Sequence, residues 1–349
     1  MGERPAIGKP IRAAAAHDRL ASAPSECHLA RMIRSAFALF SAAFLLFAAP
    51  ALAAERRYED GAGTLTVLPA PPQRIIAHAS VAAALIPYGI VPVGILRDGP
   101  PSRDRALDGL DLSAIPVVSR GWFEIDAEAV LNLDPDLIVT EYSLTEHIYQ
   151  GGTHEDAVAE RLESIAPIIG IARGTSIVDI LETYRDFAAS LGADTQTETL
   201  LAERNRFDRA VARFRQALAA KPGLSVLAVS PSASGLSIGV PDYFGELRDW
   251  RDWGLNIVSP EATPGTSYFS VSWENAEQYS ADILLLDDRW ETSSLDIMEQ
   301  HPIGRRLPAI AAGQVGDWPA EWIRSYGVYA DEIENLTALI DRSDAGLVD

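Results

Sequence analysis

The chain has 349 residues and carries 49 acidic against 29 basic residues, a formal charge of −20. Its length predicts about two domains, and a hydrophobic content of 48% excludes a disordered or collagen-like chain. The acidic balance argues against nucleic acid as a partner, because phosphate binding depends on Lys and Arg. The single cysteine excludes a disulfide framework and a metal site built from several cysteines.

Residues 32–53 have the three parts of a secretory signal peptide. Arg34 supplies the positive start, an apolar stretch follows from Ala36 to Ala49, and Ala51-Leu52-Ala53 forms a cleavage site. The apolar stretch is shorter than the roughly 20 residues that a membrane-spanning helix needs. We therefore expect cleavage before Ala54 and an exported protein.

Residues 1–31 lie upstream of Met32, where such a peptide should begin. We interpret them as the product of a misplaced start codon, with a genuine extended leader as the alternative. Residues 1–53 hold six of the basic and three of the acidic residues, so the expected mature chain, 54–349, has a charge of −23 and lacks Cys27. No cysteine follows the apolar stretch, which disfavours a lipid-anchored start.

The first part of the mature chain alternates short strands with short helices. The expected strands are 64–68, 74–78, 90–95, 137–140 and 165–171, and the expected helices are 79–87, 126–134 and 155–163. Such alternation predicts an α/β layer with a largely parallel sheet.

Helical periodicity then replaces the alternation. Apolar residues recur at helical spacing over 176–191, Gly192 is the expected C-cap, and a second helix is expected over 197–219. Alternation resumes with strands at 224–229, 236–240 and 282–286 and helices at 242–252 and 322–341. The predicted fold is two α/β lobes with parallel-type sheets, 54–175 and 193–349, joined by one long rigid helix over 176–192.

A weak internal repeat supports two lobes built alike. Residues 128–141 read EAVLNLDPDLIVTE and residues 274–287 read ENAEQYSADILLLD. In each copy a glutamate opens a helix, and an aspartate eight residues later precedes a buried strand. The pairs are Glu128 with Asp136 and Glu274 with Asp282.

No nucleotide-binding or zinc-protease motif accompanies this pattern: GxGxxG, the Walker loop and HExxH are all absent. His147 and His154 could form a metal pair, but a solvated Gly-rich loop fits better, because Zn²⁺ needs three or four convergent ligands. Asp287, Asp288 and His301 could serve a hydrolase only if they met in one pocket.

Tryptophans concentrate near the expected strand ends. All seven lie in the mature chain: Trp122, Trp250, Trp253, Trp273, Trp290, Trp318 and Trp322. Ligands of open α/β sheets bind beyond the carboxyl ends of the strands, and aromatic rings there give a large contact area. Trp122, Trp318 and Trp322 are therefore candidates for a ligand cleft, with packing at the lobe edges as the alternative. Trp250 and Trp253 are expected to pack.

The order and spacing of five segments resemble the periplasmic binding proteins of ABC importers for ferric siderophores, haem and cobalamin. The segments are PQRIIAHASVAAALIPYGIVPVGI (72–95), EAVLNLDPDLIVTEY (128–142), ERLESIAPIIGI (160–171), SIVDILETYRDFAASLGAD (176–194) and WENAEQYSADILLLDD (273–288). The resemblance covers nearly all of 64–342. It implies a periplasmic protein whose two α/β lobes are joined by one rigid helix, with a shallow cleft between them.

The resemblance also implies a docking role for Glu128 and Glu274. In this family one acidic residue on the outer surface of each lobe binds arginines of the permease in the inner membrane, and these two glutamates occupy the matching places. Two carboxylates that are held apart on a rigid protein would fix the orientation of the protein on the permease, through charge-assisted hydrogen bonds to the arginines. The alternative is two ordinary carboxylates favoured by the dipole at a helix N-terminus.

For the ligand, hydroxamate-siderophore binders of this family place an Arg and a Tyr in the first lobe and aromatic residues in the second. The candidates in the matching segments are Arg120, Trp122 and Tyr142 in the first lobe and Tyr268, Trp318, Trp322, Arg324 and Tyr326 in the second. Trp122 lies close to the place of the expected Arg, with Arg120 just before it, which departs from the pattern. Aromatic faces would cover the organic shell of the chelate, and Arg or Tyr would bind its oxygens.

The expected protein is a monomeric solute-binding protein that delivers a ferric siderophore, of the hydroxamate type, to a permease. It would need no cofactor, no metal site of its own and no catalytic residue, because the iron arrives already chelated. Haem, cobalamin or a bare metal ion are alternatives within the binding class, and Tyr142 or His147 could serve as an axial ligand of haem. An exported α/β hydrolase is the alternative of a different class.

Overall fold

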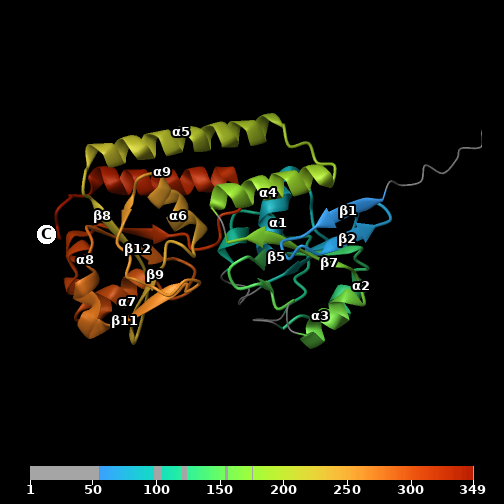
Figure 1. Cartoon of the computed structure of the whole chain (residues 1–349), viewed down its shortest axis with the longest axis horizontal. Helices are drawn as coiled ribbons and strands as arrows, with labels where there is room; N and C mark the ends of the chain where they lie inside the picture. The colour runs from blue at the N-terminus through green and yellow to red at the C-terminus, as the bar shows by residue number, and fades with distance from the viewer. Residues whose placement is uncertain (1–54, 98–103, 120–123, 154–155, 175, 349) are drawn as a thin grey trace, which may run out of the picture. The chain divides into compact units, whose positions relative to one another are not determined.

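The computed structural model describes residues 55–97, 104–119, 124–153, 156–174 and 176–348 (Figure 1). The predicted signal peptide and the extension before it lie outside the described residues. So do Arg120, Trp122 and His154.

The first sheet has five strands in the order β4-β3-β5-β6, with β7 paired to β5. Its strands are β3 (Ile75–His78), β4 (Gly94–Leu96), β5 (Leu137–Ser143), β6 (Ile148–Tyr149) and β7 (Ile168–Arg173), and its helices are α1 (Ala79–Leu85), α2 (Ala127–Asn132) and α3 (Asp156–Glu163). β3, β4, β5 and β7 run parallel, and only β6 is antiparallel to its neighbour. A hairpin of β1 (Arg56–Glu59) and β2 (Leu65–Leu68) precedes them. The parallel α/β layer is confirmed.

One expected strand is shorter than predicted. Residues 90–95 were expected to be extended, but β4 begins at Gly94. The backbone N–H of Ile90 bonds the Leu85 carbonyl at 3.2 Å and so belongs to the turn after α1. Pro92 has no N–H to donate to a neighbouring strand.

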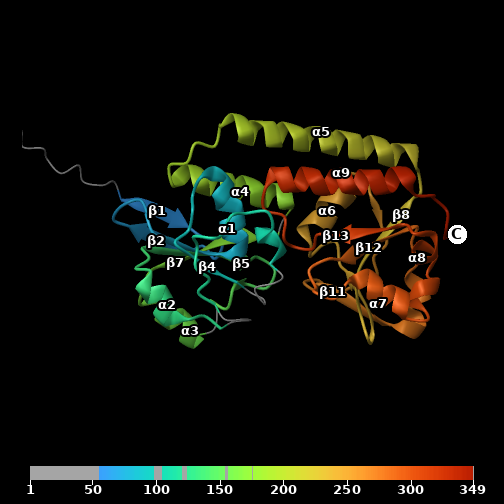
Figure 2. The same cartoon turned by 180° about the vertical axis from the view of Figure 1, so that it is seen from behind.

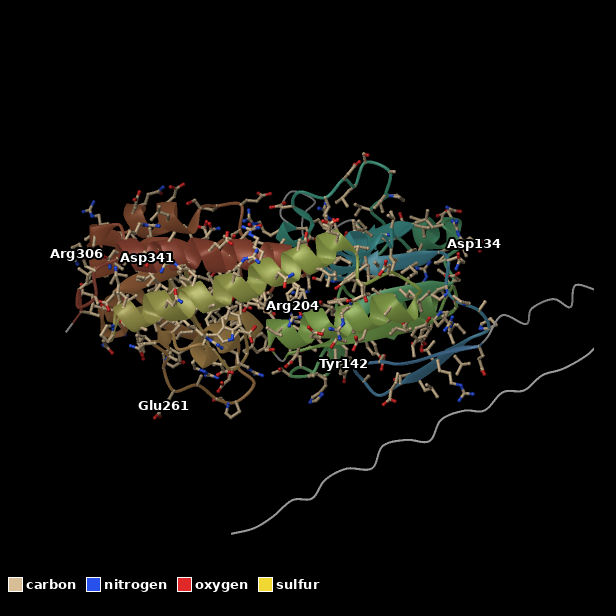
Figure 3. All side chains as sticks on the ribbon, turned by 90° about the horizontal axis from the view of Figure 1, so that it is seen from above. Asp134, Tyr142, Arg204, Glu261, Arg306 and Asp341 are labelled. Carbon is tan, nitrogen blue, oxygen red and sulfur yellow. The ribbon has the colours of Figure 1, made fainter. Side chains whose placement is uncertain are left out.

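Two helices, α4 (Ile177–Ser190) and α5 (Glu198–Ala220), lie between the two sheets in the sequence. Each follows a polar N-cap, Ser176 for α4 and Thr197 for α5, whose side-chain oxygens accept backbone N–H groups of the first turn. α4 buries the predicted apolar face, including Ile180 and Tyr184. Seen from above in Figure 3, α5 crosses between α9 (Tyr326–Arg342) and α4.

The second sheet has six strands in the order β11-β9-β8-β12-β13, with β10 paired to β8. Its strands are β8 (Ser225–Ser232), β9 (Gly235–Gly239), β10 (Asn256–Ile257), β11 (Tyr268–Ser272), β12 (Ile283–Asp287) and β13 (Val315–Trp318). β8, β10, β12 and β13 are parallel, whereas β9 and β11 are antiparallel to their neighbours. The tight turn from β8 to β9 requires Gly235, whose φ is 153° and where a Cβ would lie 2.1 Å from the Val271 carbonyl oxygen.

The remaining helices of this lobe are α6 (Gly245–Asp252), α7 (Ser294–Gln300), α8 (Pro308–Ala312) and α9, with a 3-10 helix over Trp273–Tyr279. The helix predicted over 322–341 begins only at Tyr326, because Ser325 Oγ accepts the Val328 N–H at 3.2 Å and caps the first turn. Trp322 and Arg324 therefore precede the helix. Figure 2 shows α9 beside α5 on one side of the second sheet.

The internal repeat has a structural basis. Asp136, just before β5, accepts the backbone N–H groups of Gln73 and Arg74 at the start of β3 at 2.6 and 2.9 Å. Asp282, just before β12, accepts the backbone N–H of Ser225 at the start of β8 at 2.8 Å. Each aspartate thus ties the beginnings of two neighbouring parallel strands together.

The two lobes share apolar packing. One buried cluster includes Ala77 of β3, Tyr184 of α4, Phe207 of α5 and Tyr329 of α9, and residues 52–349 form one compact unit. The two-lobe α/β fold with long helices between the sheets is confirmed. Among the described residues, no helix is both long and apolar enough to cross a membrane.

Candidate functional site

Strand ends from both lobes meet at a group of charged side chains, which we call the inter-lobe charge cluster. It consists of Glu141, Arg173, Asp287, Arg289, Glu321 and Arg324. Glu141 and Arg173 come from the carboxyl halves of β5 and β7, Asp287 and Arg289 from the end of β12, and Glu321 and Arg324 from the segment after β13. This is the edge at which open α/β sheets bind ligands.

A buried ion pair forms the deepest part of the cluster. Arg324 donates from Nε to Glu141 Oε1 at 2.7 Å and from Nη2 to Oε2 at 2.9 Å, and the Tyr184 hydroxyl donates to Oε1 at 2.6 Å. Both charged side chains are only 3% exposed. Burial alone would raise the pKa of Glu141, but the Arg324 guanidinium outweighs it and lowers that pKa to about 2. The pair therefore joins β5 of one lobe to the segment just before α9 in the other, and both partners are charged.

A second carboxylate, Glu321, bridges two arginines from different lobes. Arg173 Nη1 donates to Glu321 Oε1 at 2.6 Å, and Arg289 Nη1 donates to Oε2 at 3.0 Å. Arg289 also forms a fork with Asp287, at 3.0 and 2.8 Å. Burial opposes ionisation of Glu321, but the two guanidiniums lower its pKa, so the bridge is charged.

Two further contacts cross between the lobes. Arg105 Nη2 donates to Asp288 Oδ2 at 2.8 Å, and its guanidinium lies 5.1 Å from the centre of the Trp322 ring. The Tyr243 hydroxyl donates to Glu146 Oε1 at 2.9 Å. Together with the charge cluster, these contacts hold the strand-end faces of the two lobes against each other.

Aromatic side chains adjoin the charged groups in the second lobe. Trp290, just after β12, is 48% exposed, and its indole N–H lies 3.1 Å from both Ser230 Oγ and Asp287 Oδ2. The Tyr268 hydroxyl accepts a hydrogen bond from Arg289. An exposed indole beside guanidinium donors can cover an apolar ligand surface while the donors bind its oxygens.

Glu246, at the first turn of α6, is a fully buried carboxyl group beside the cluster. Its Oε1 accepts the Trp318 indole N–H at 2.9 Å, while Oε2 has no hydrogen-bond partner among the described residues. It lines a cavity of about 20 Å³ with Arg173, Tyr243 and Glu321. Burial raises the pKa of Glu246 to about 7.

We expect Glu246→Gln to remove a pH-dependent loss of stability. A carboxyl group with a pKa of 4.5 when unfolded and about 7 when folded stabilises the fold fully below pH 4.5, and that contribution is lost as the pH rises through 7. Between pH 4.5 and pH 8 the wild type should lose about 3 kcal/mol that the variant does not lose. Urea denaturation across this range measures the difference.

The exposed Glu299→Gln in α7 is the control and should follow the wild-type curve. Parallel pH profiles for Glu246→Gln and the wild type would show that Glu246 does not titrate in this range.

The sequence-predicted ligand residues fall in different places. Trp322, Arg324 and Tyr268 contact the cluster or the inter-lobe contacts beside it. Trp318 is completely buried, its indole bonded to Glu246. Tyr326 lies at a junction of three helices: its hydroxyl bonds Glu182 of α4, and Arg204 of α5, labelled in Figure 3, donates to it.

Tyr142 lies away from Glu141, its neighbour on β5, because successive residues of a strand point to opposite faces. Its ring packs against Tyr149, with centroids 5.1 Å apart. The predicted docking glutamates, Glu128 in the first turn of α2 and Glu274 in the first turn of the 3-10 helix, are both exposed.

The groups of the hydrolase alternative have separate partners. Asp287 bonds Arg289, and Asp288 bonds Arg105 and Trp322. The His301 ring stacks on Trp273 with centroids 3.9 Å apart. The described residues therefore do not form the acid–histidine pocket which that alternative requires. Nor do any three His, Cys, Asp or Glu side chains among them gather as metal ligands.

Sequence reasoning missed Glu141, Arg173, Arg289, Glu321 and Tyr243. Arg173 and Arg289 follow predicted strands, at 165–171 and 282–286, and this position was the available signal. No signal in the sequence pointed to Glu321, because its two arginine partners are 148 and 32 residues away along the chain. A hollow of about 570 Å³ lies along α9 and β13, with Arg105 and Asp288 at its wall.

Comparison with known proteins gives a consistent picture. A family model described as periplasmic binding protein matches residues 90–322, whereas no curated protein matches the chain. DesE of Streptomyces coelicolor, a ferric-siderophore receptor, is similar in structure with a TM-score of 0.75 and 28% identity, over 83% of this chain and 99% of DesE.

Two more distant structures share the fold. The petrobactin-binding protein YclQ of Bacillus subtilis is 17% identical with a TM-score of 0.62. Staphylococcus aureus SirA, solved with staphyloferrin B, is 19% identical with a TM-score of 0.59. Each match covers 83% of this chain and 99% of the other.

Proposed function

This chain belongs to the family of periplasmic binding proteins, and from that premise we propose that it is the solute-binding protein of an ABC importer and captures a ferric siderophore between its two lobes. The observation that carries the proposal is the similarity to the ferric-siderophore receptor DesE, which extends over 99% of the DesE chain. Strand ends from both lobes meet at charged and aromatic side chains. This arrangement supports a ligand site at the inter-lobe charge cluster.

The protein would bind the chelate without changing it. Guanidinium groups such as Arg289 and hydroxyl groups such as Tyr243 donate hydrogen bonds, which suit the oxygens that surround a chelated iron. The exposed ring of Trp290 would cover part of the organic shell. The buried Glu141–Arg324 pair and the shared apolar cluster oppose wide opening of the lobes, so we expect closure on binding to be small.

Export and docking complete the proposal. The signal peptide over 32–53 would direct a monomeric mature chain to the periplasm, with lobes at 54–175 and 193–349. Glu128 and Glu274 would bind arginines of the permease. Their exposure in the free protein supports this role, because docking carboxylates must be accessible.

The test is a fluorescence titration of the mature chain with ferric hydroxamate, catecholate and citrate chelates. We expect saturable tryptophan quenching by at least one chelate at roughly micromolar concentration or below, because the exposed Trp290 and the half-buried Trp322 adjoin the proposed site. The iron-free siderophores are the control for nonspecific quenching. The absence of saturable quenching with all three ferric chelates would overturn the proposal.

A further inference from the structure

We infer that Glu321 is a specificity-determining residue, which makes the inter-lobe site select uncharged or cationic ferric chelates over anionic ones. This inference rests on the proposed function and adds the charge class of the ligand. It follows from where Glu321 lies, how its backbone is held, and which charges surround it.

The first observation is that Glu321 fills a ready-made anion site. Arg173 and Arg289 come from different lobes, and each donates to a different oxygen of the same carboxylate, at 2.6 and 3.0 Å. Two guanidiniums converging on one carboxylate are what an anionic chelate would use for anchorage. Here the protein supplies the anion itself.

The second observation is that the backbone fixes Glu321 in place. Glu321 has a φ of 65°, in the left-handed region that costs a non-glycine residue energy. The residues around it are anchored: Ala320 and Ile323 are completely buried, and the Ala320 N–H bonds the Trp318 carbonyl at 2.8 Å. An anionic ligand would have to break two charge-assisted bonds to displace this carboxylate.

The third observation is the charge balance. In the part of the chain that the structure describes, the guanidiniums of the cluster and its inter-lobe contacts all have carboxylate partners. The four guanidiniums are Arg105, Arg173, Arg289 and Arg324, and the five carboxylates are Glu141, Glu146, Asp287, Asp288 and Glu321.

An anionic chelate therefore meets no excess positive charge among these groups. It meets repulsion from Glu321 and from Glu146, whose side chain is 40% exposed. An uncharged trishydroxamate, or one that bears an ammonium group, avoids this penalty and can still accept hydrogen bonds from the arginines.

The experiment compares dissociation constants of the mature chain and of Glu321→Gln for three probes. The probes are an uncharged ferric trishydroxamate, a ferric tris-catecholate and ferric citrate. The wild type should prefer the trishydroxamate by at least about tenfold. Glu321→Gln should tighten binding of the two anionic probes by about tenfold or more, and should change trishydroxamate binding by less than about threefold.

Glu321→Asn is the second variant, because asparagine tolerates the left-handed backbone and is too short to bridge both arginines. Glu299→Gln, at an exposed site in α7, is the matched control and should bind all probes as the wild type does. The circular dichroism and melting temperature of each variant verify its folding.

The outcomes separate this inference from the proposed function. If chelates bind but the wild type prefers the anionic probes, or if neither Glu321 variant shifts the preference, the inference is overturned and the proposed function stands. If no chelate binds to the wild type, both are overturned.

Discussion

Replacing Glu141 with glutamine should destabilise the protein by about 3–5 kcal/mol, because the Arg324 guanidinium would remain buried without its counter-charge. Both side chains are 3% exposed, and the wild-type pair makes two hydrogen bonds at 2.7 and 2.9 Å. Urea denaturation at pH 7 measures the change in the free energy of unfolding.

The same variant should also change how the free energy of unfolding depends on pH below pH 4.5. Glu141 has a pKa of 4.5 when unfolded and about 2 when folded, so its contribution is present above pH 4.5 and is lost as the pH falls toward 2. The wild type should lose about 3 kcal/mol over that range that Glu141→Gln does not lose.

Two comparisons make this prediction specific. Glu141→Leu combined with Arg324→Leu should recover most of the lost stability, because no unpaired charge remains buried. Arg206→Gln breaks exposed pairs with Glu334 and Asp331 and should cost less than about 1 kcal/mol. If Glu141→Gln costs no more than Arg206→Gln, the pair does not stabilise the contact between the lobes.

Reversing the charge of both proposed docking residues, with Glu128→Arg and Glu274→Arg together, should abolish iron delivery while leaving chelate binding intact. Losing a charge pair that docking buries typically costs 2–5 kcal/mol, which corresponds to a loss of affinity for the permease of roughly 30-fold to several thousand-fold. Both residues are exposed and precede different strands, so neither substitution disturbs the core. Uptake of a labelled ferric chelate by cells that carry the permease measures the effect.

Glu124→Arg with Glu277→Arg is the matched control, because these exposed glutamates lie in the same two segments. It makes the same change in net charge and should keep most of the uptake. If both double variants lost uptake equally, the cause would be the change in net charge, and the specific docking role of Glu128 and Glu274 would be contradicted.

The sequence allowed the lobes to be predicted where periodicity was strong. The helices α4 and α5 follow the predicted ranges closely, because their apolar residues recur over several turns and polar caps mark their starts. The strands β11 and β13 were missed because they are short and mix polar with apolar residues, as in VGDW. Such segments are extended only because a neighbouring strand pairs with them.

The arrangement of the charge cluster is harder to predict. Trp322 and Arg324, which were named as ligand candidates, lie in the segment after β13, whereas the sequence placed them in a helix that Ser325 starts only later. The pairing of Arg324 with Glu141 joins residues 183 positions apart, and the left-handed backbone of Glu321 depends on its buried neighbours. Neither feature has a local signature in the sequence.

The most direct test of the central claim is a native mass spectrum of the protein purified from iron-starved cells. We predict a species heavier than the mature chain by the mass of one ferric chelate, which is lost when the protein is denatured. Only the bare chain, with no added mass even after incubation with ferric siderophores, would contradict the claim that this protein captures a ferric siderophore.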